Sequence, residues 1–320
     1  MKAPTGTGHR SIPDSVTVAD LSEEEILDLF AGKDAWHFAG VPGEGIPPLQ
    51  VADCGHGVTL VIPPYGSATC FPTSVGMAAS WNPDLLHEVG RALGRESRAK
   101  GCGMLLAPMI NLHRLPCGGR NYESFSEDPL LTARLAAAIV NGLQEEGTGA
   151  CVKVFLCNNQ QKEQMDTSAE VDRQTLEDLY LRLFKLIFEY CDPWAVMTSY
   201  NPVNGEYPSD SAYWIQTILR KRLGYGGVVI SDWHAIHSEQ ALTSGLDIEM
   251  PGPAKFLTRR NFRKKLEAGE LGWRELRERG KRILDLHAKA RPAREGSPLV
   301  SPPELDSPRH RALARKVAEE

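Results

Sequence analysis

Four short, unbroken apolar runs, separated by longer amphipathic segments, constrain the fold of this 320-residue chain most strongly. The runs lie at residues 103–111, 150–157, 194–200 and 227–232. Runs of this kind are typical of parallel strands that are buried on both faces. Strands that alternate with helices indicate an α/β fold with a mostly parallel sheet. We therefore predict a TIM-like barrel of the (β/α)8 type, complete or in part.

Helix start signals precede the amphipathic segments. Asn82 and Asp128 each stand directly before a proline, so an N-cap side chain is followed by a residue suited to the first helical position. Asp172 precedes a third segment, and apolar residues recur at helical spacing in a fourth. We expect helices over residues 82–100, 128–143, 172–187 and 215–223.

Each apolar run ends in polar residues. The first three runs lead into Asn111, into Lys153 with Asn158, and into Tyr200 with Asn201. In a barrel of parallel strands, functional side chains lie at the carboxyl ends of the strands, above the core. The start of a loop would explain any one of these residues, but it explains the repeated pattern less easily. The pattern therefore favours a site at this end of the barrel.

Asp232 closes the fourth run and is the most suggestive single residue. An isolated aspartate in this place is interpreted first as a helix cap or as an acid that solvates a loop. Here, however, the neighbouring Trp233 offers an apolar face of the kind on which sugars stack. Together with the other strand-end polar groups, this neighbourhood favours a chemical role for Asp232.

Proline content suggests how the chain is divided. Residues 291–308 contain five prolines and are predicted to form an extended linker. We divide the chain into an N-terminal tail (1–20), a barrel domain (21–290), this linker, and the first helix of a second domain (309–320). The rest of that second domain is expected to lie beyond the chain.

Charge and composition exclude several classes of function. The net charge is −5 with acidic and basic residues interspersed, which argues against a nucleic-acid partner. No run approaches the ~20 apolar residues of a membrane span. Seven scattered cysteines without a CxxC pair are expected to be free thiols, and we predict no metal and no cofactor. The first residues lack an apolar stretch, so we expect a cytoplasmic protein, with secretion left open if the N-terminus was trimmed.

Longer motifs follow one another between residue 21 and about residue 252. They are residues 32–37 (GKDAWH), 70–82 (CFPTSVGMAASWN), 119–129 (GRNYESFSEDP), 194–205 (WAVMTSYNPVNG), 231–233 (SDW) and 246–252 (LDIEMPG). In this order they resemble glycoside hydrolase family 3 in its β-glucosidase-like branch. The resemblance implies retaining hydrolysis of β-glucosides or related β-glycosides, as part of carbohydrate catabolism.

The resemblance also implies roles for individual residues. Asp232 matches the family's nucleophile, which attacks the anomeric carbon to form a glycosyl-enzyme. Because a nucleophile must be ionised, we expect neighbouring cations to keep the pKa of Asp232 low. The other positions implied to bind the carbohydrate or to shape its −1 subsite are Asp53, Arg120, Lys153, Met197, Tyr200 and Trp233.

The chain departs from the family pattern at several positions. The family's Lys-His pair is Lys153-Val154 here, and a glutamate and an arginine of the family correspond to Gln161 and Gln164. The turn at residues 53–59 has also lost a proline and an arginine. Each lost polar partner in a buried site costs about 1–3 kcal/mol. These losses favour an alternative function, that of a carbohydrate-binding pseudoenzyme with an eroded −1 subsite.

The acid/base of the reaction is the second gap. In the family it comes from the following domain, so we expect low activity from this chain alone and a C-terminal domain as its partner; homo-oligomerisation is left open. Glu123, Glu127 and Glu249 lie in the matched motifs, but structural anchoring is the role we expect for each. A phosphate-binding barrel enzyme is disfavoured, because no glycine-rich phosphate loop is recognisable near the late strands.

Overall fold

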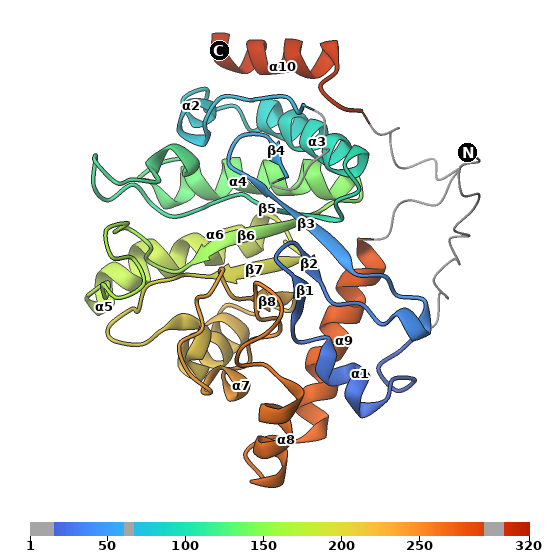
Figure 1. The fold of residues 1–320 in the computed structure, drawn as a ribbon. Helices are drawn as coiled ribbons and strands as arrows, with labels where there is room; N and C mark the ends of the chain where they lie inside the picture. The colour runs from blue at the N-terminus through green and yellow to red at the C-terminus, as the bar shows by residue number, and fades with distance from the viewer. Residues whose placement is uncertain (1–15, 61–66, 291–303) are drawn as a thin grey trace, which may run out of the picture.

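The computed structural model describes residues 16–60, 67–290 and 304–320. Its centre is a curved sheet in which parallel strands follow one another (Figure 1). Strands β5 to β8 are buried over their whole length, as their apolar runs predict. The α/β class and the four predicted strands are therefore confirmed. In sheet order the parallel strands are β3 (Leu49–Cys54), β5 (Met104–Leu106), β6 (Gly149–Phe155), β7 (Ala195–Thr198) and β8 (Val228–Ile230).

Three shorter strands adjoin β3. β1 (Gly32–Asp34) pairs with β2 (His37–Phe38), and both β2 and β4 (Val58–Thr59) pair with β3, in each case antiparallel. Single parallel bridges join Ile230 to Ile248 and Ala31 to Glu249, and they carry the sheet from β8 back to the start of β1. The sheet differs from a regular (β/α)8 barrel because β2 runs against its neighbours and residues 248–249 replace a full strand.

Two glycines allow a close approach at this junction. The amide of Gly252 donates a hydrogen bond of 2.9 Å to the carbonyl oxygen of Asp34, at the end of β1. A Cβ atom on Gly32 would lie only 2.6 Å from the amide nitrogen of Gly252, and one on Gly252 would collide with the carbonyl oxygen of Gly32. The glycine that ends the 246–252 motif is therefore required for packing against β1.

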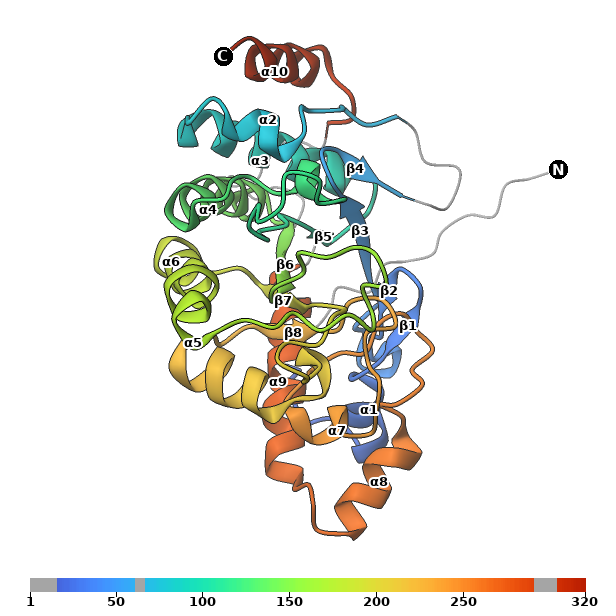
Figure 2. The ribbon, with the colours of Figure 1, turned by 90° about the vertical axis from the view of Figure 1, so that its left-hand side faces the viewer.

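Helices pack around the outside of the sheet (Figure 1, Figure 2). The side chains of Asn82, Asp128 and Asp172 accept hydrogen bonds from the first turns of the helices that follow them, at 3.1, 2.7 and 3.0 Å. The four predicted helices are confirmed. They are α3 (Pro83–Ala99), α4 (Pro129–Glu145), the continuous run of α5 (Arg173–Thr175), η3 (Leu176–Leu181) and α6 (Arg182–Tyr190), and η5 (Tyr213–Arg222).

Shorter helices and the C-terminal helices complete the described structure. α1 packs against α8 and α9, and α9 also contacts β8. These elements are α1 (Glu23–Asp28), η1 (Pro42–Glu44), α2 (Ser74–Ala78), η2 (Asn121–Glu123), η4 (Pro208–Asp210), α7 (Ala241–Ser244), α8 (Arg259–Glu267), α9 (Trp273–Lys289) and α10 (Pro308–Glu319).

Helix α10 matches the helix predicted after the linker, and it packs against α2 and α3. Its His310 is buried, and the Nδ1 atom lies 2.9 Å from Oε1 of the buried Glu96 on α3. The hydroxyl of Thr69 donates to the same oxygen at 2.5 Å. Most of the predicted linker, residues 291–303, lies outside the described residues. The assignment of residues 309–320 to a second domain stays a prediction.

The cysteines are free, as predicted. Within the described ranges, no helix is both long enough and apolar enough to cross a membrane. The buried cysteines are Cys54, Cys102, Cys151, Cys157 and Cys191, and the exposed ones are Cys70 and Cys117.

A buried carboxylate, Asp247, joins β8 to the helices behind it. Its Oδ2 atom accepts hydrogen bonds from the amide of Val229 in β8 at 2.8 Å and from Arg220 in η5 at 2.6 Å. Its Oδ1 atom accepts a hydrogen bond of 2.8 Å from Arg282 in α9. The attraction of the two arginines outweighs the cost of burial, so the pKa of Asp247 is lowered and the carboxylate stays ionised.

We expect Asp247→Ala to lower the free energy of unfolding by about 3 kcal/mol, because it leaves two half-buried arginines and the buried amide of Val229 without their partner. The control is Asp285→Ala, which removes the exposed 2.7 Å ion pair with Lys281 on α9 and should cost less than about 1 kcal/mol. Urea denaturation of the two variants and the unchanged chain measures both losses. Equal small losses would contradict this role for Asp247.

Candidate active site

A cavity of about 470 Å³ lies among the residues that follow or end the central strands. We call it the strand-end cavity. All of the predicted site residues line it: Asp53, Arg120, Lys153, Met197, Tyr200, Asp232 and Trp233. The structure therefore brings together side chains that are up to 180 positions apart in the sequence. The remaining lining residues are Trp36, Leu106, Tyr122, Glu123 and Gln164.

The sheet explains why these side chains meet. Asp53, Lys153 and Met197 lie within β3, β6 and β7, which are parallel and have Lys153 paired with Met197 in register. Asp232 follows β8 by two residues. Parallel strands that start at one end of a sheet finish at the other, so their last side chains gather at one edge. Arg120 comes from the loop between β5 and α4, directly before η2.

Lys153 is the most buried cation of the cavity, with 4% of its surface exposed. Its Nζ atom lies 2.8 Å from Oδ1 of Asp53 and 3.9 Å from Oε2 of Glu123. Burial favours the neutral amine, but the charges of Asp53 and Glu123 and the hydrogen bond to Asp53 together outweigh this effect and raise the pKa of Lys153. The charge of Lys153 in turn lowers the pKa of Asp53 against the effect of burial. Both groups are therefore ionised near neutral pH.

Arg120 and Glu123 form a two-pronged ion pair. The Nε and Nη2 atoms of Arg120 donate hydrogen bonds of 2.8 and 2.9 Å to the two carboxylate oxygens of Glu123. Burial would raise the pKa of Glu123, but these hydrogen bonds and the charges of Arg120 and Lys153 together outweigh it and lower that pKa. Glu123 is thus an ionised anchor that orients Arg120, which agrees with the structural role expected from the sequence.

Asp232 is 6% exposed, and its Oδ1 atom accepts a hydrogen bond of 2.7 Å from the amide of Trp233. The hydroxyl of Tyr200 also donates to its carboxylate. Burial raises the pKa of Asp232, and the hydrogen bond from Tyr200 and the charges of Lys153 and Arg120 only partly offset this effect. The expectation of a low pKa was therefore wrong. Among the described residues, no lysine or arginine nitrogen lies within 4.0 Å of this carboxylate, so the cations act only at longer range.

Two tryptophans form one wall of the cavity. The rings of Trp36 and Trp233 lie 5.5 Å apart between centroids at a tilt of 40°. The Nε1 atom of Trp233 donates a hydrogen bond of 3.1 Å to the carbonyl oxygen of Ala35, which fixes the ring. Trp36 lies in the short turn between β1 and β2. The wall presents apolar ring surface beside the charged groups, which is the combination that a sugar with one apolar face requires.

The departures from the family pattern occupy different environments. Val154 is buried, with 1% of its surface exposed, and is not a lining residue of the cavity. Gln161 also lies outside the lining, and its side chain donates to the Oδ1 atom of Asn158 at 2.5 Å. Gln164 lines the cavity, and its Oε1 atom has no hydrogen-bond partner among the described residues. Gln164 is therefore the only one of the three substitutions that reaches this cavity.

The other two acids of the motifs lie away from the lining. The carboxylate of Glu249 accepts hydrogen bonds from the amides of Lys255, Phe256 and Leu257 at 2.6 to 3.2 Å, so it anchors that loop. Glu127 is exposed. Neither residue lines the strand-end cavity.

Sequence reasoning assigned no role to Trp36, Leu106 or Tyr122, although all three line the cavity. Trp36 and Tyr122 both lie inside motifs that carry the family resemblance, so their aromatic side chains were a usable signal. Leu106 ends β5 and is indistinguishable in the sequence from its buried apolar neighbours.

The protein-family comparison matches residues 41–286 to the model described as "Glycosyl hydrolase family 3 N terminal domain". A "Probable beta-glucosidase I" from Aspergillus clavatus is 38% identical over 307 residues, which cover 95% of this chain and 36% of that protein. A "Beta-glucosidase" from Rhizobium radiobacter is 37% identical over 304 residues and covers 93% of this chain. The chain thus spans about 36% of the length of the curated relatives that it matches.

Comparison with solved structures also finds beta-glucosidases that match most of this chain. The beta-glucosidase from Kluyveromyces marxianus in complex with glucose matches with a TM-score of 0.87 and 32% identity, over 94% of this chain and 37% of that one.

The raised pKa of Asp232 makes a prediction about stability. Because burial raises the pKa of Asp232, ionisation of this carboxylate destabilises the folded chain above the ordinary pKa of an aspartate, and this cost disappears as the pH falls to that ordinary value. Asp232→Asn should therefore raise the melting temperature at pH 7. A gain of about 1 kcal/mol in the free energy of unfolding corresponds to a rise of roughly 2 °C. The gain should shrink toward pH 4. Melting curves across this pH range, with the exposed Asp285→Asn as the control, measure the effect. A loss of stability at pH 7 would contradict it.

Proposed function

The chain belongs to glycosyl hydrolase family 3, whose N-terminal domain it contains, and on this premise we propose that it provides the sugar-binding cavity and the nucleophile of a β-glucosidase that retains configuration. The observation that carries the proposal is the strand-end cavity, where Asp232 shares one space with Lys153, Arg120 and Asp53. The curated relatives named above as β-glucosidases support the substrate class.

In the proposed reaction, a carboxylate oxygen of Asp232 attacks the anomeric carbon, and the bond to the leaving oxygen breaks. The amide of Trp233 and the hydroxyl of Tyr200 hold the carboxylate in place. Burial raises the free energy of the ionised form, and the ester that replaces it carries no charge. The same burial that raises the pKa of Asp232 therefore favours formation of the glycosyl-enzyme.

The ion pairs of the cavity position the sugar. Asp53 offers carboxylate oxygens to sugar hydroxyls, and about half of its side-chain surface is exposed to receive them. Lys153 donates a hydrogen bond to Asp53, and its ammonium group has further protons to donate to the sugar. Arg120, fixed by Glu123, presents its remaining donors toward the same space. The tryptophan wall excludes water from one side of the ring.

The general acid must come from elsewhere. Among the described residues that line the cavity, the carboxylates other than Asp232 are those of Asp53 and Glu123, and both have lowered pKa values. Groups that stay ionised cannot protonate a leaving oxygen at neutral pH. Since the relatives are much longer than this chain, we place the acid/base in a region that follows residue 320 of a longer protein.

A carbohydrate-binding pseudoenzyme is the second candidate, and Gln164 is the observation that favours it. In the family resemblance this position belongs to an arginine, whereas here a neutral amide with an unpartnered oxygen lines the cavity. The two candidates share a sugar-binding cavity and differ only in whether Asp232 reacts.

Covalent trapping separates the two candidates. A 2-deoxy-2-fluoro-β-glucoside with an activated leaving group should add one fluoroglucosyl group to the chain, because such a leaving group needs no acid. Peptide mass mapping should place the group on Asp232, and Asp232→Asn should abolish the addition. Binding of glucose without any addition would favour the pseudoenzyme, and a label on another carboxylate would contradict the assignment.

The choice of leaving group makes a further prediction for this chain alone. Alkyl β-glucosides should be cleaved about 10²–10⁴-fold more slowly than aryl glucosides with acidic phenols, because the missing general acid contributes a factor of this size. Azide, which needs no general base, should accelerate turnover of the aryl substrates and yield a glucosyl azide. Steady-state rates with matched alkyl and aryl glucosides measure this. Equal rates would mean that an acid lies within residues 1–320, and Glu123→Gln and Glu127→Gln would then be tested.

A further inference from the structure

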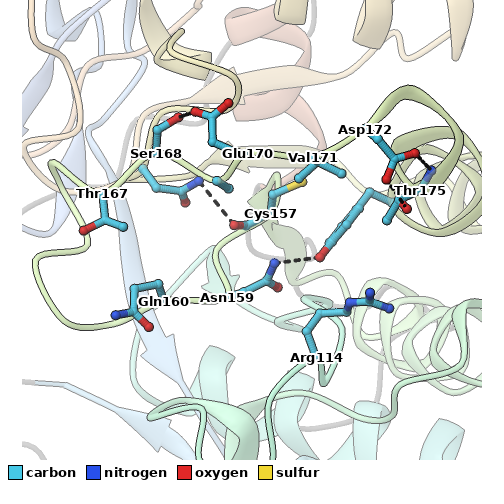
Figure 3. A pocket seen from close by; sticks show the side chains of 13 residues that line it. Arg114, Cys157, Asn159, Gln160, Thr167, Ser168, Glu170, Val171, Asp172 and Thr175 are labelled. Atoms are coloured by element: carbon cyan, nitrogen blue, oxygen red, sulfur yellow. Dashed lines mark hydrogen bonds between the residues drawn. The ribbon is translucent and has the colours of Figure 1, made fainter.

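A second cavity, of about 320 Å³, lies beside the strand-end cavity. We call it the Asn201 cavity. The two cavities share a stretch of chain, because Tyr200 lines the strand-end cavity and the next residue, Asn201, lines the second cavity. The loop after β6 borders both, with Gln164 in the first and residues 167–172 in the second. In Figure 3, Arg114 and Asn159 lie on one side of the Asn201 cavity, and Ser168, Glu170 and Val171 lie on the other.

A chain of hydrogen bonds ends in an unused donor at this cavity. The Nδ2 atom of Asn111 donates to Oδ1 of Asn159 at 3.0 Å, and Nδ2 of Asn159 donates to the hydroxyl of Tyr180 at 2.6 Å. Tyr180 is 4% exposed, and burial raises its pKa, so the hydroxyl keeps its proton. That proton has no acceptor among the described residues.

An unused acceptor lies in the same lining. Asn201 is 2% exposed, and its Nδ2 atom donates to the carbonyl oxygens of Cys157 and Pro202 at 3.2 and 3.0 Å. These bonds fix the orientation of the carboxamide. Its Oδ1 atom is buried and has no hydrogen-bond partner within the described part of the chain. An unsatisfied buried acceptor is unfavourable, and a hydroxyl group of a ligand would supply the missing hydrogen bond.

The charges of the lining argue against an anionic ligand. Arg114 is exposed and forms no ion pair with the described residues. Glu170 offers the opposite charge, with one oxygen accepting a 2.6 Å hydrogen bond from Ser168. Both carboxylate oxygens of Asp172 accept hydrogen bonds from Thr175 at the start of α5. The formal charge of the lining is therefore slightly negative, although Arg114 supplies strong donors at one side.

We propose that the Asn201 cavity is a second carbohydrate-binding site, which takes an uncharged, hydroxylated ligand the size of one hexose. A hydroxyl group both donates and accepts, so a ligand rich in hydroxyls meets the unused donors of Tyr180 and Arg114 and the unused acceptor of Asn201 together. The volume lies within the roughly 300–1,000 Å³ of typical ligand pockets. It corresponds to about ten water molecules, so a single buried water does not fill it.

A titration of the chain with D-glucose, followed by protein NMR, tests this proposal. We expect two groups of resonances to shift with separate dissociation constants, one group in each cavity. Tyr180→Phe and Arg114→Gln should each weaken the second site about tenfold, as the loss of one hydrogen bond with a strong donor does, and leave the first unchanged. Lys153→Met should weaken only the first site. Arg260→Gln is the matched control, because this exposed arginine on α8 lines neither cavity.

The outcomes separate this proposal from the proposed function. A single binding event that Lys153→Met removes, and that Tyr180→Phe and Arg114→Gln leave unchanged, would overturn the second site and leave the glucosidase proposal intact. Binding that responds only to Tyr180→Phe and Arg114→Gln would support the second site and count against the strand-end cavity. Equal weakening by Arg114→Gln and Arg260→Gln would overturn the second site as well, because it would reflect net charge alone.

Discussion

The carboxylate of Asp247 is the interaction on which the placement of the site depends. It accepts hydrogen bonds from β8, from η5 and from α9, and so it ties the strand that leads to Asp232 to the helices behind it. A fully buried charge of this kind is tolerated only because two arginines and a backbone amide surround it. The motif at residues 246–252 therefore has a structural function at both ends, since its last residue, Gly252, packs directly against β1.

The charged groups that line the strand-end cavity differ in whether they have a close ionic partner. Asp53, Glu123, Lys153 and Arg120 are joined in one network of ion pairs, so their charges are stabilised in the folded chain. Of the described carboxylates that line the cavity, only that of Asp232 has a raised pKa, because burial outweighs its hydrogen bonds and its distant cations. Groups of one type whose environments push their pKa values apart are typical of catalytic sites. In the function that we propose, the paired groups hold the sugar, and the carboxylate of Asp232 reacts.

Sequence patterns predicted the parts of the fold that obey simple periodicities. Buried apolar runs located β5 to β8, and cap residues such as Asn82 and Asp128 located the starts of α3 and α4. The strands β1 and β2 were not predicted, because their two or three residues lie in no longer apolar run of the kind that surrounds β5 and β8. The single bridges at residues 248–249 escaped prediction for the same reason.

The sequence predicted which residues line the site better than it predicted their pKa values. Every proposed residue lines the cavity, because strand ends and motif positions both follow from the sequence. The pKa of Asp232 depends on burial and on distances between residues far apart in the chain, which no local pattern records. The same is true of Val154, which the sequence places beside Lys153 and the structure places outside the lining.

A crystal structure of the chain with D-glucose bound tests the central claim most directly. The account predicts glucose in the strand-end cavity, with hydroxyls on Asp53 and Lys153, its ring against Trp233, and its anomeric carbon facing the carboxylate of Asp232. An empty strand-end cavity at saturating glucose, or a sugar whose anomeric carbon points away from Asp232, would contradict it.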